Sequence, residues 1–169
     1  MVFKRIYWIS GLVLLILSTF VLGANKKPLD WSLPLKTLDG KTESLKKFQN
    51  KKVIIINFWA TWCGPCRSEM PDFEKFYRAY KDSGVVIIGV SVDTSSGDVR
   101  KFLGDVKVTY PIYRDGPNGP WAKAYSGLPF LPMTVIYRGN GARVKTFIGP
   151  RTFDELKAVV EPLLSSKDG

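Results

Sequence analysis

Two uninterrupted runs of apolar, mostly β-branched residues constrain the fold of this 169-residue chain more than any other feature. They are Val53–Ala60 (VIIINFWA) and Val85–Val92 (VVIIGVSV), and neither alternates between apolar and polar residues. Such runs are typical of strands buried on both faces of a mainly parallel sheet, which helices must then cover on both sides. Apolar residues recur at helical spacing after each run, from Met70 to Tyr80 and from Val99 to Val106. The order strand, helix, strand, helix predicts an α/β domain.

Shorter elements are expected around this unit. An Asp39-Gly40 turn between short apolar segments predicts a small hairpin near the start of the domain. Thr134–Tyr137 and Ala142–Ile148, joined by a Gly-Asn-Gly turn, predict an antiparallel hairpin near its end. We also expect a short strand at Tyr110–Tyr113 and a short helix at Trp121–Tyr125.

A last helix is predicted from a capping box. Thr152 is followed three residues later by Glu155, the spacing at which the two side chains satisfy each other's backbone N–H groups. Because proline lacks a backbone donor, we expect this helix to end near Pro162.

The N-terminal segment predicts export and a membrane anchor. Lys4 and Arg5 precede Ile6–Asn25, which carries no charge, and Lys26-Lys27 follow it. The run reaches the roughly 18 residues that span a bilayer and exceeds the usual signal-peptide core of about 7–15. Residues 1–27 are therefore predicted to be a single-pass anchor, and residues 28–169 one domain. Cleavage near Gly23-Ala24 is the alternative, which would release a periplasmic or secreted domain.

The charges around the anchor predict its orientation. Lys4, Arg5 and the terminal amine favour a cytoplasmic start, which places the domain on the extracytoplasmic side of the cell membrane. The whole chain has a formal charge of +10, a balance that suits anionic membranes or nucleic acid but also serves solubility. We expect no nucleic-acid partner.

Residue counts exclude many kinds of catalytic site. The chain has no His, which rules out Ser-His-Asp and Cys-His catalysis and every His-containing zinc site. Its two Cys are too few for an all-Cys metal site. The chemistry therefore centres on the two thiols acting together.

Both thiols lie in the segment Trp62-Cys63-Gly64-Pro65-Cys66, between the first buried strand and the first long helix. As a structural staple, so short a loop would contribute only about 2 kcal/mol in the chain-entropy model. Covalent haem attachment requires His directly after the second Cys, and position 67 is Arg. A redox-active pair explains the spacing better than either alternative.

The position of the pair predicts a role for each thiol. A Cys at a helix N-terminus faces unpaired backbone N–H groups, which favour the thiolate, so Cys63 is the expected nucleophile. Cys66 lies one turn into the helix and can resolve the mixed disulfide. Pro65 suits the first helical turn. Without any His, the candidate acid/base is Glu69, whose alternative role is a surface charge near the helix N-terminus.

The residues around the dithiol resemble a known family. The segment 57–71 (NFWATWCGPCRSEMP) is similar to the active-site segment of the thioredoxin superfamily, and specifically of its membrane-anchored TlpA/ResA-like branch. Asp39-Gly40-Lys41 followed by Ser44-Leu45 resembles the N-terminal hairpin of that branch, and Leu131-Pro132-Met133-Thr134 resembles its cis-proline loop.

The resemblance implies a thioredoxin fold, with a mixed central sheet flanked by helices, an N-terminal β-hairpin and a βα insertion. It further implies that Pro132 is cis and lies beside Cys63, with Pro129 as the competing candidate. The substrate-binding residues that it implies are Trp62, Pro65, Leu131 and Pro132.

Two positions depart from relatives. Cytoplasmic thioredoxins carry a buried Asp where this chain has Asn57, and some ResA-like proteins carry an acid where it has Gly64. Glu69 matches the acid that ResA-like proteins place after the second Cys.

The implied function is thiol-disulfide exchange outside the cytoplasm without a metal or organic cofactor. Gly64-Pro65 is the dipeptide of reducing thioredoxins, which favours a reductase. The resemblance implies disulfide-bearing exported proteins as substrates, apocytochrome c before haem attachment among them, and a membrane dithiol protein as electron donor. The alternatives are a redox-inert peptide-binding or chaperone module and a peroxiredoxin-like peroxidase, whose peroxidatic loop has no match at 61–66.

Overall fold

The computed structural model describes residues 27–165, so nearly all of the predicted anchor lies outside the described residues. The elements in chain order are β1 (Pro34–Lys36), β2 (Thr42–Ser44), η1 (Leu45–Phe48), β3 (Val53–Trp59), α2 (Gly64–Tyr80), η2 (Lys81–Ser83), β4 (Val85–Ser91), α3 (Ser96–Asp105), β5 (Ile112–Arg114), α4 (Pro120–Ala124), β6 (Met133–Arg138), β7 (Arg143–Ile148) and α5 (Phe153–Ser165). Within residues 27–165, no helix is long and apolar enough to cross a bilayer.

The central sheet is mixed, as the resemblance implied. Its strand order is β5-β4-β3-β6-β7, in which β3 runs parallel to β4 and antiparallel to β6. The register places Asn57, in the middle strand, between Gly89 of β4 and Thr134 of β6. Two polar side chains, Asn57 and Thr134, therefore lie side by side at the centre of the sheet.

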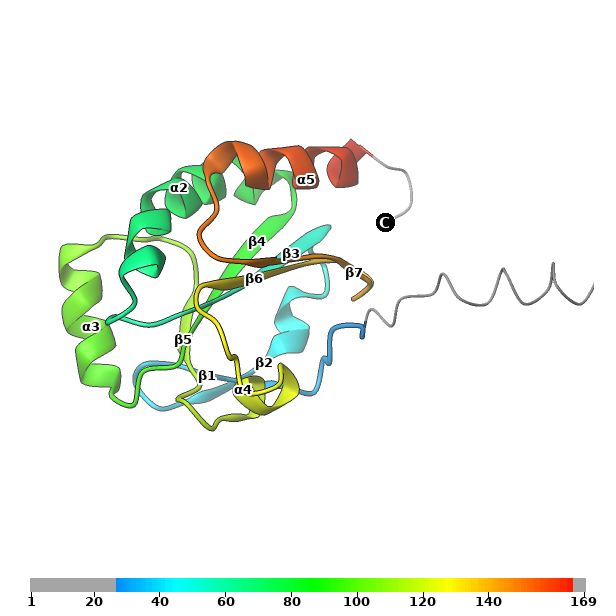
Figure 1. The fold of residues 1–169 in the computed structure, drawn as a ribbon. Helices are drawn as coiled ribbons and strands as arrows, with labels where there is room; N and C mark the ends of the chain where they lie inside the picture. The colour runs from blue at the N-terminus through cyan, green and yellow to red at the C-terminus, as the bar shows by residue number, and fades with distance from the viewer. Residues whose placement is uncertain (1–26, 166–169) are drawn as a thin grey trace, which may run out of the picture.

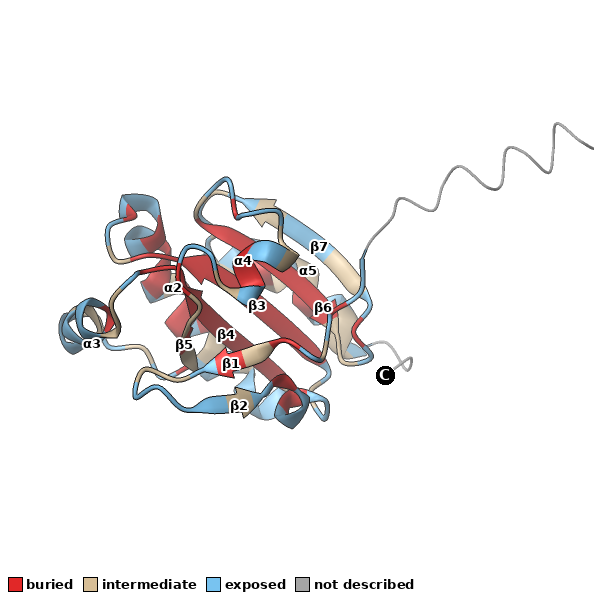
Figure 2. Ribbon diagram, turned by 90° about the horizontal axis from the view of Figure 1, so that it is seen from below, coloured by how far each residue is buried: buried red, intermediate tan, exposed pale blue. Residues whose placement is uncertain are grey.

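Two apolar cores lie on opposite faces of this sheet. Helices α2 and α5 cover one face, and α4 with the β1–β2 hairpin lies across the other (Figure 1). Alternate β3 residues supply the two cores, with Val53 and Ile55 on the α2/α5 side and Ile54 and Ile56 on the other. Figure 2 shows β3 and β4 buried along their length and β6 buried up to its last residue, whereas the edge strand β7 has only intermediate and exposed residues. The two runs that lacked alternation are thus the two central parallel strands.

The predicted hairpins and the capping box are confirmed. Strands β1 and β2 pair antiparallel through a turn in which Gly40 has a φ of +89°, a value that favours glycine. Strands β6 and β7 form the second hairpin. The Thr152 N–H donates to Glu155 Oε2 over 2.9 Å, and the Glu155 N–H donates to Thr152 Oγ1 over 3.3 Å. β5 and α4 overlap the short strand expected at Tyr110–Tyr113 and the short helix expected at Trp121–Tyr125.

The predicted end of the last helix is wrong. α5 continues through Pro162 to Ser165. Leu163 and Leu164 beyond the proline pack against the apolar core under α5. Their burial retains the last turn, although Pro162 supplies no backbone donor to the helix.

Candidate active site

Cys63 and Cys66 form a disulfide at the start of α2, with an Sγ–Sγ distance of 2.06 Å. Cys63 is the N-cap residue of the helix, and the Cys66 N–H points to its Sγ over 3.2 Å. Cys63 retains 6% of its surface exposed, whereas Cys66 is fully buried. A reacting molecule can therefore reach Cys63 and not Cys66, and the helix N-terminus favours negative charge on the Cys63 sulfur.

The loop before Cys63 is fixed to the end of β4. Asp93 accepts hydrogen bonds from the Thr61 N–H over 2.9 Å and from Thr61 Oγ1 over 2.7 Å. It also accepts one from Ser91 Oγ over 2.7 Å. No sequence motif indicated this role of Asp93, because its hydrogen-bond partners lie at the ends of two different strands.

Glu69 points into the protein, so the alternative of a surface charge is wrong. The residue is 3% exposed. Asn57 Nδ2 donates to its Oε1 over 2.8 Å, and the Arg151 backbone N–H donates to its Oε2 over 2.9 Å. Burial raises the pKa of Glu69 to about 7, although the hydrogen bonds from Asn57 and Arg151 act in the opposite direction. Its carboxyl group can therefore gain or lose a proton near neutral pH.

The polar network extends from Glu69 across the sheet. Asn57 Nδ2 also donates to Thr134 Oγ1 over 3.1 Å, while Asn57 Oδ1 is buried without a partner among the described residues. Thr134, Asn57, Glu69 and the Arg151 amide thus join β6, β3, α2 and the segment before α5. In the sequence, Asn57 stands out only because cytoplasmic thioredoxins have Asp at this position, and no local pattern indicates the roles of Thr134 and Arg151.

The Leu131–Pro132 peptide bond is cis, as the resemblance implied, and no other cis bond occurs within residues 27–165. Pro129, the competing candidate, is therefore trans. The Gly149 N–H donates to the Pro132 carbonyl over 2.9 Å and fixes this loop to the end of β7.

A groove of about 520 Å³ opens beside the disulfide. Its lining is mostly apolar and comes from the dithiol segment, the end of β4, the segment between β5 and α4, and the loop before β6, namely Trp62, Cys63, Gly64, Pro65, Val92, Pro117, Gly127, Leu128, Pro129 and Leu131. Of the four predicted substrate-binding residues, Trp62, Pro65 and Leu131 line the groove, and Pro132 lies outside its lining. Trp62 is 71% exposed.

This geometry suits dithiol-disulfide exchange. One sulfur is reachable at a helix N-terminus, its partner is buried one turn away, a titratable carboxyl lies on the same helix, and an apolar groove borders the reachable sulfur. Within the described part of the chain, no group of three or more acidic or Cys side chains could hold a metal ion.

Residues 24–150 match the AhpC/TSA family. Thiol-disulfide oxidoreductase ResA of Oceanobacillus iheyensis is 34% identical over 126 residues, which cover 75% of this chain and 64% of that protein. The sporulation thiol-disulfide oxidoreductase A of Bacillus subtilis is 30% identical over 168 residues, or 95% of this chain and 99% of the relative. The crystal structure of StoA from Bacillus subtilis superimposes with a TM-score of 0.64 and 32% identity, covering 76% of this chain and 96% of StoA.

Proposed function

Since the chain belongs to the AhpC/TSA family of the thioredoxin superfamily and is a thiol-disulfide oxidoreductase of the ResA and StoA type, we propose that it acts outside the cytoplasm as a protein-disulfide reductase. The observation that carries this proposal is the asymmetry of the dithiol. Only Cys63 borders the groove and retains exposed surface, and Cys66 is buried behind it. A substrate disulfide can therefore meet one sulfur only.

The reaction begins with the reduced protein. The Cys63 thiolate attacks one sulfur of a substrate disulfide, forming a mixed disulfide and releasing the other substrate sulfur as a thiolate. Cys66 then loses its proton and attacks Cys63 Sγ. The Cys63–Cys66 bond forms, the second substrate sulfur leaves as a thiolate, and the substrate has gained two electrons. The structure contains the oxidised product of this sequence.

Glu69 is proposed to accept the Cys66 proton. It lies one helical turn after Cys66, and its pKa of about 7 allows the carboxylate to accept a proton at neutral pH. The donors Asn57 and Arg151 hold both carboxylate oxygens in place.

The substrate and electron donor are proposed from the resemblance. The Gly64-Pro65 dipeptide favours the reducing direction. The resemblance to TlpA/ResA-like proteins implies apocytochrome c as a substrate. The uncharged run Ile6–Asn25 supports attachment to the membrane and a membrane dithiol protein as the source of electrons. The groove offers apolar contacts to an extended segment around the substrate cysteine.

A trapping experiment tests the proposal. In Cys66→Ser, the mixed disulfide cannot resolve, so the variant expressed at its native location and quenched with acid should carry covalently bound partners that reducing agent releases. We expect exported proteins among them, apocytochromes with CxxCH sites included. Cys63→Ser is the matched control and should trap nothing. Trapping of exported proteins without cytochromes would reject the cytochrome assignment alone, whereas a complete lack of covalent partners would reject the order of attack.

A further inference from the structure

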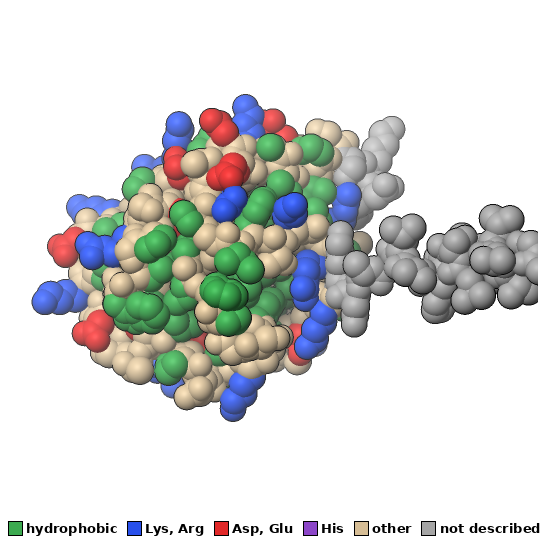
Figure 3. All heavy atoms as spheres, in the orientation of Figure 1, with side chains coloured by type: hydrophobic (Ala, Val, Ile, Leu, Met, Phe, Trp, Pro, Cys, Tyr) green, Lys and Arg blue, Asp and Glu red, His purple; other side chains and the backbone are tan. Residues whose placement is uncertain are grey.

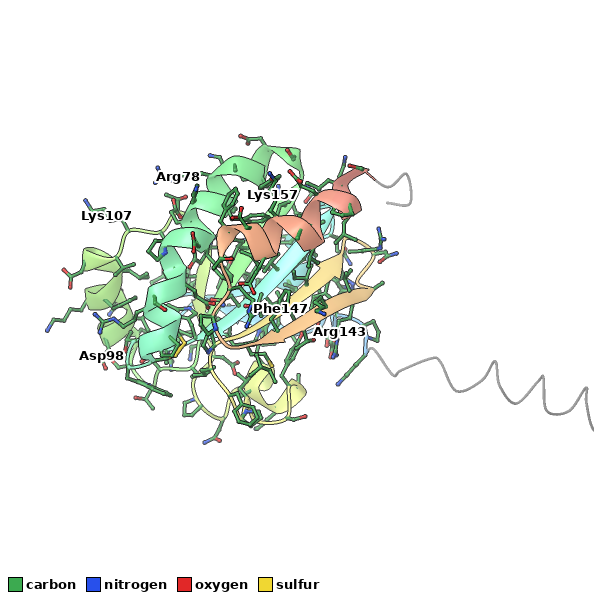
Figure 4. All side chains as sticks on the ribbon, turned by 45° about the horizontal axis from the view of Figure 1, so that its top comes forward. Arg78, Asp98, Lys107, Arg143, Phe147 and Lys157 are labelled. Carbon is green, nitrogen blue, oxygen red and sulfur yellow. A yellow bond between two sulfur atoms is a disulfide. The ribbon has the colours of Figure 1, made fainter. Side chains whose placement is uncertain are left out.

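The first described residues lie against the β6–β7 turn. The Leu29 N–H donates to the Gly141 carbonyl over 2.9 Å, and Arg143 Nε donates to the Lys27 carbonyl over 2.9 Å. The Gly139 N–H donates to the Lys52 carbonyl over 2.8 Å, which brings the residues before β3 to the same place. In Figure 4, Arg143 lies at the end of the sheet beside the start of the described chain, away from the disulfide.

This end of the sheet is basic. We call the set Lys27, Lys51, Lys52, Arg138 and Arg143 the basic end. Within residues 27–165, no carboxylate lies within salt-bridge distance of Lys27, Lys51 or Lys52. Figure 3 shows Lys and Arg side chains along the margin of the domain where the described chain begins.

Asp30 offsets part of the charge of Lys27. Asp30 is close enough to Lys27 to feel its charge, but it accepts its hydrogen bonds from Ser32. Asp82 lies in η2, next to Lys81, so that pair adds no net charge. Among the described residues, Lys51, Lys52 and Arg143 therefore have no carboxylate within salt-bridge distance.

The sequence places the basic end close to the segment that we propose as the membrane anchor. The uncharged run ends at Asn25, two residues before Lys27. Since one residue extends the chain by at most about 3.6 Å, Lys27 lies within about 7 Å of the end of that run. Arg143 and the β6–β7 turn, which contact residues 27–29, must then lie at the level of the lipid headgroups.

We propose that the basic end binds the phosphate groups of anionic lipids in the membrane that holds residues 6–25. This inference rests on the proposed membrane anchor. Lys and Arg side chains near a membrane surface are attracted to anionic headgroups over about a Debye length, roughly 8–10 Å at physiological salt. The anchor holds the domain at the bilayer, and the basic end determines which side of the domain faces it.

Lipid contact at the basic end would direct the active site away from the membrane. Lys51 and Lys52 precede β3, and Cys63 follows it. Seven strand residues at about 3.3 Å each separate the two ends by roughly 20 Å. The groove beside Cys63 would then open toward the aqueous side, where exported substrates diffuse.

Lysine footprinting of the full chain in lipid nanodiscs tests the surface. A water-soluble amine-acetylating reagent would be applied to the protein in phosphatidylcholine discs with and without phosphatidylglycerol, and modification would be measured by mass spectrometry. We expect Lys51 and Lys52 to be acetylated several-fold more slowly in anionic discs at low salt, and this protection to disappear at high salt. Lys101 and Lys107, exposed on the α3 side, should react equally in both lipids.

Paired charge reversals provide the control for net charge. Arg138→Glu/Arg143→Glu should abolish the protection of Lys51 and Lys52, whereas Lys101→Glu/Lys107→Glu, with the same change in net charge, should retain it. A folded chain that stays in the discs but shows equal acetylation of Lys51 and Lys52 in both lipids would overturn the lipid surface alone. A chain that does not remain with the discs would overturn the anchor and the surface together.

Discussion

Asn57 Nδ2 lies 2.8 Å from Glu69 Oε1 and donates a hydrogen bond to it inside the protein, where both side chains are almost completely buried. This contact stabilises the ionised carboxyl group, while desolvation stabilises the neutral one. Burial has the larger effect and raises the pKa of Glu69 to about 7. The balance between the two effects sets the pH range in which Glu69 can transfer protons.

Glu69→Gln should slow thiol-disulfide exchange. Glutamine keeps the shape of the side chain but cannot accept a proton, and a general acid/base contributes about 10²–10⁴-fold, with the lower end expected where water can assist. The rise in rate near pH 7 should disappear, and the rate should instead increase at higher pH, because Cys66 must then lose its proton to solvent. The measurement is insulin reduction as a function of pH.

Glu74→Gln is the matched control for that experiment. Glu74 lies on the same helix, but its carboxyl group bonds to Arg78 and Thr109, away from the dithiol. This variant should keep the pH–rate profile of the parent protein. An unchanged profile in Glu69→Gln would reduce Glu69 to a structural residue.

The stability of the oxidised protein should decrease between pH 4.5 and pH 7. Glu69 has a folded-state pKa of about 7, above its ordinary value of 4.5, so the folded state binds more protons than the unfolded state in this range. The protonated Glu69 therefore contributes its full stability at low pH. As pH rises, the free energy of unfolding decreases by about 3 kcal/mol.

Urea unfolding at several pH values measures this loss, and Glu69→Gln separates it from other titrations. The unfolding free energy of the parent minus that of Glu69→Gln should decrease as pH rises to 7, because only the parent carries the titrating carboxyl group. A difference that stays constant from pH 4.5 to pH 8 would contradict the raised pKa.

Cys63 should react before Cys66 with iodoacetamide in the reduced protein. Cys63 is the exposed member of the pair and caps α2, where the helix N-terminus favours the thiolate. Because Cys63 is also the more exposed thiol, we expect it to be labelled on the order of tenfold faster than Cys66. Peptide mapping by mass spectrometry reports both sites, and faster labelling of Cys66 would reverse their assigned roles.

Trp62→Ala should weaken the binding of protein substrates without impairing the dithiol chemistry. Trp62 is 71% exposed and lines the groove, so it offers an aromatic surface to a bound segment. We expect KM for a protein disulfide to rise by about tenfold, in line with the loss of a buried aromatic contact, and kcat to change little. Reduction of a small aromatic disulfide serves to show that the thiols remain active.

Phe130→Ala is the control for exposure alone. Phe130 is 59% exposed in the neighbouring loop but does not line the groove. Its substitution should leave KM for the protein substrate near that of the parent. Equal effects of the two substitutions would assign binding to the general apolar character of this face and not to the groove.

The sequence by itself determined the features that depend on local patterns. The unbroken β-branched runs predicted β3 and β4, because a strand buried on both faces shows no alternation. The Thr152–Glu155 spacing predicted the start of α5, and the position of Cys63 before an apolar helical pattern predicted the N-cap thiol. The cis bond at Pro132 followed from the resemblance, since spacing alone does not distinguish it from an ordinary trans proline.

Only the tertiary structure decided the environment of Glu69 and the end of α5. Asn57 and Thr134 are 77 residues apart in sequence, and Glu69 and Arg151 are 82 apart, so no local pattern records that they meet. Sheet register and helix packing bring them together and remove the carboxyl group from water, which is what raises its pKa. In the same way, core contacts of Leu163 and Leu164 extend α5 past Pro162, because burial of apolar surface outweighs one missing backbone hydrogen bond.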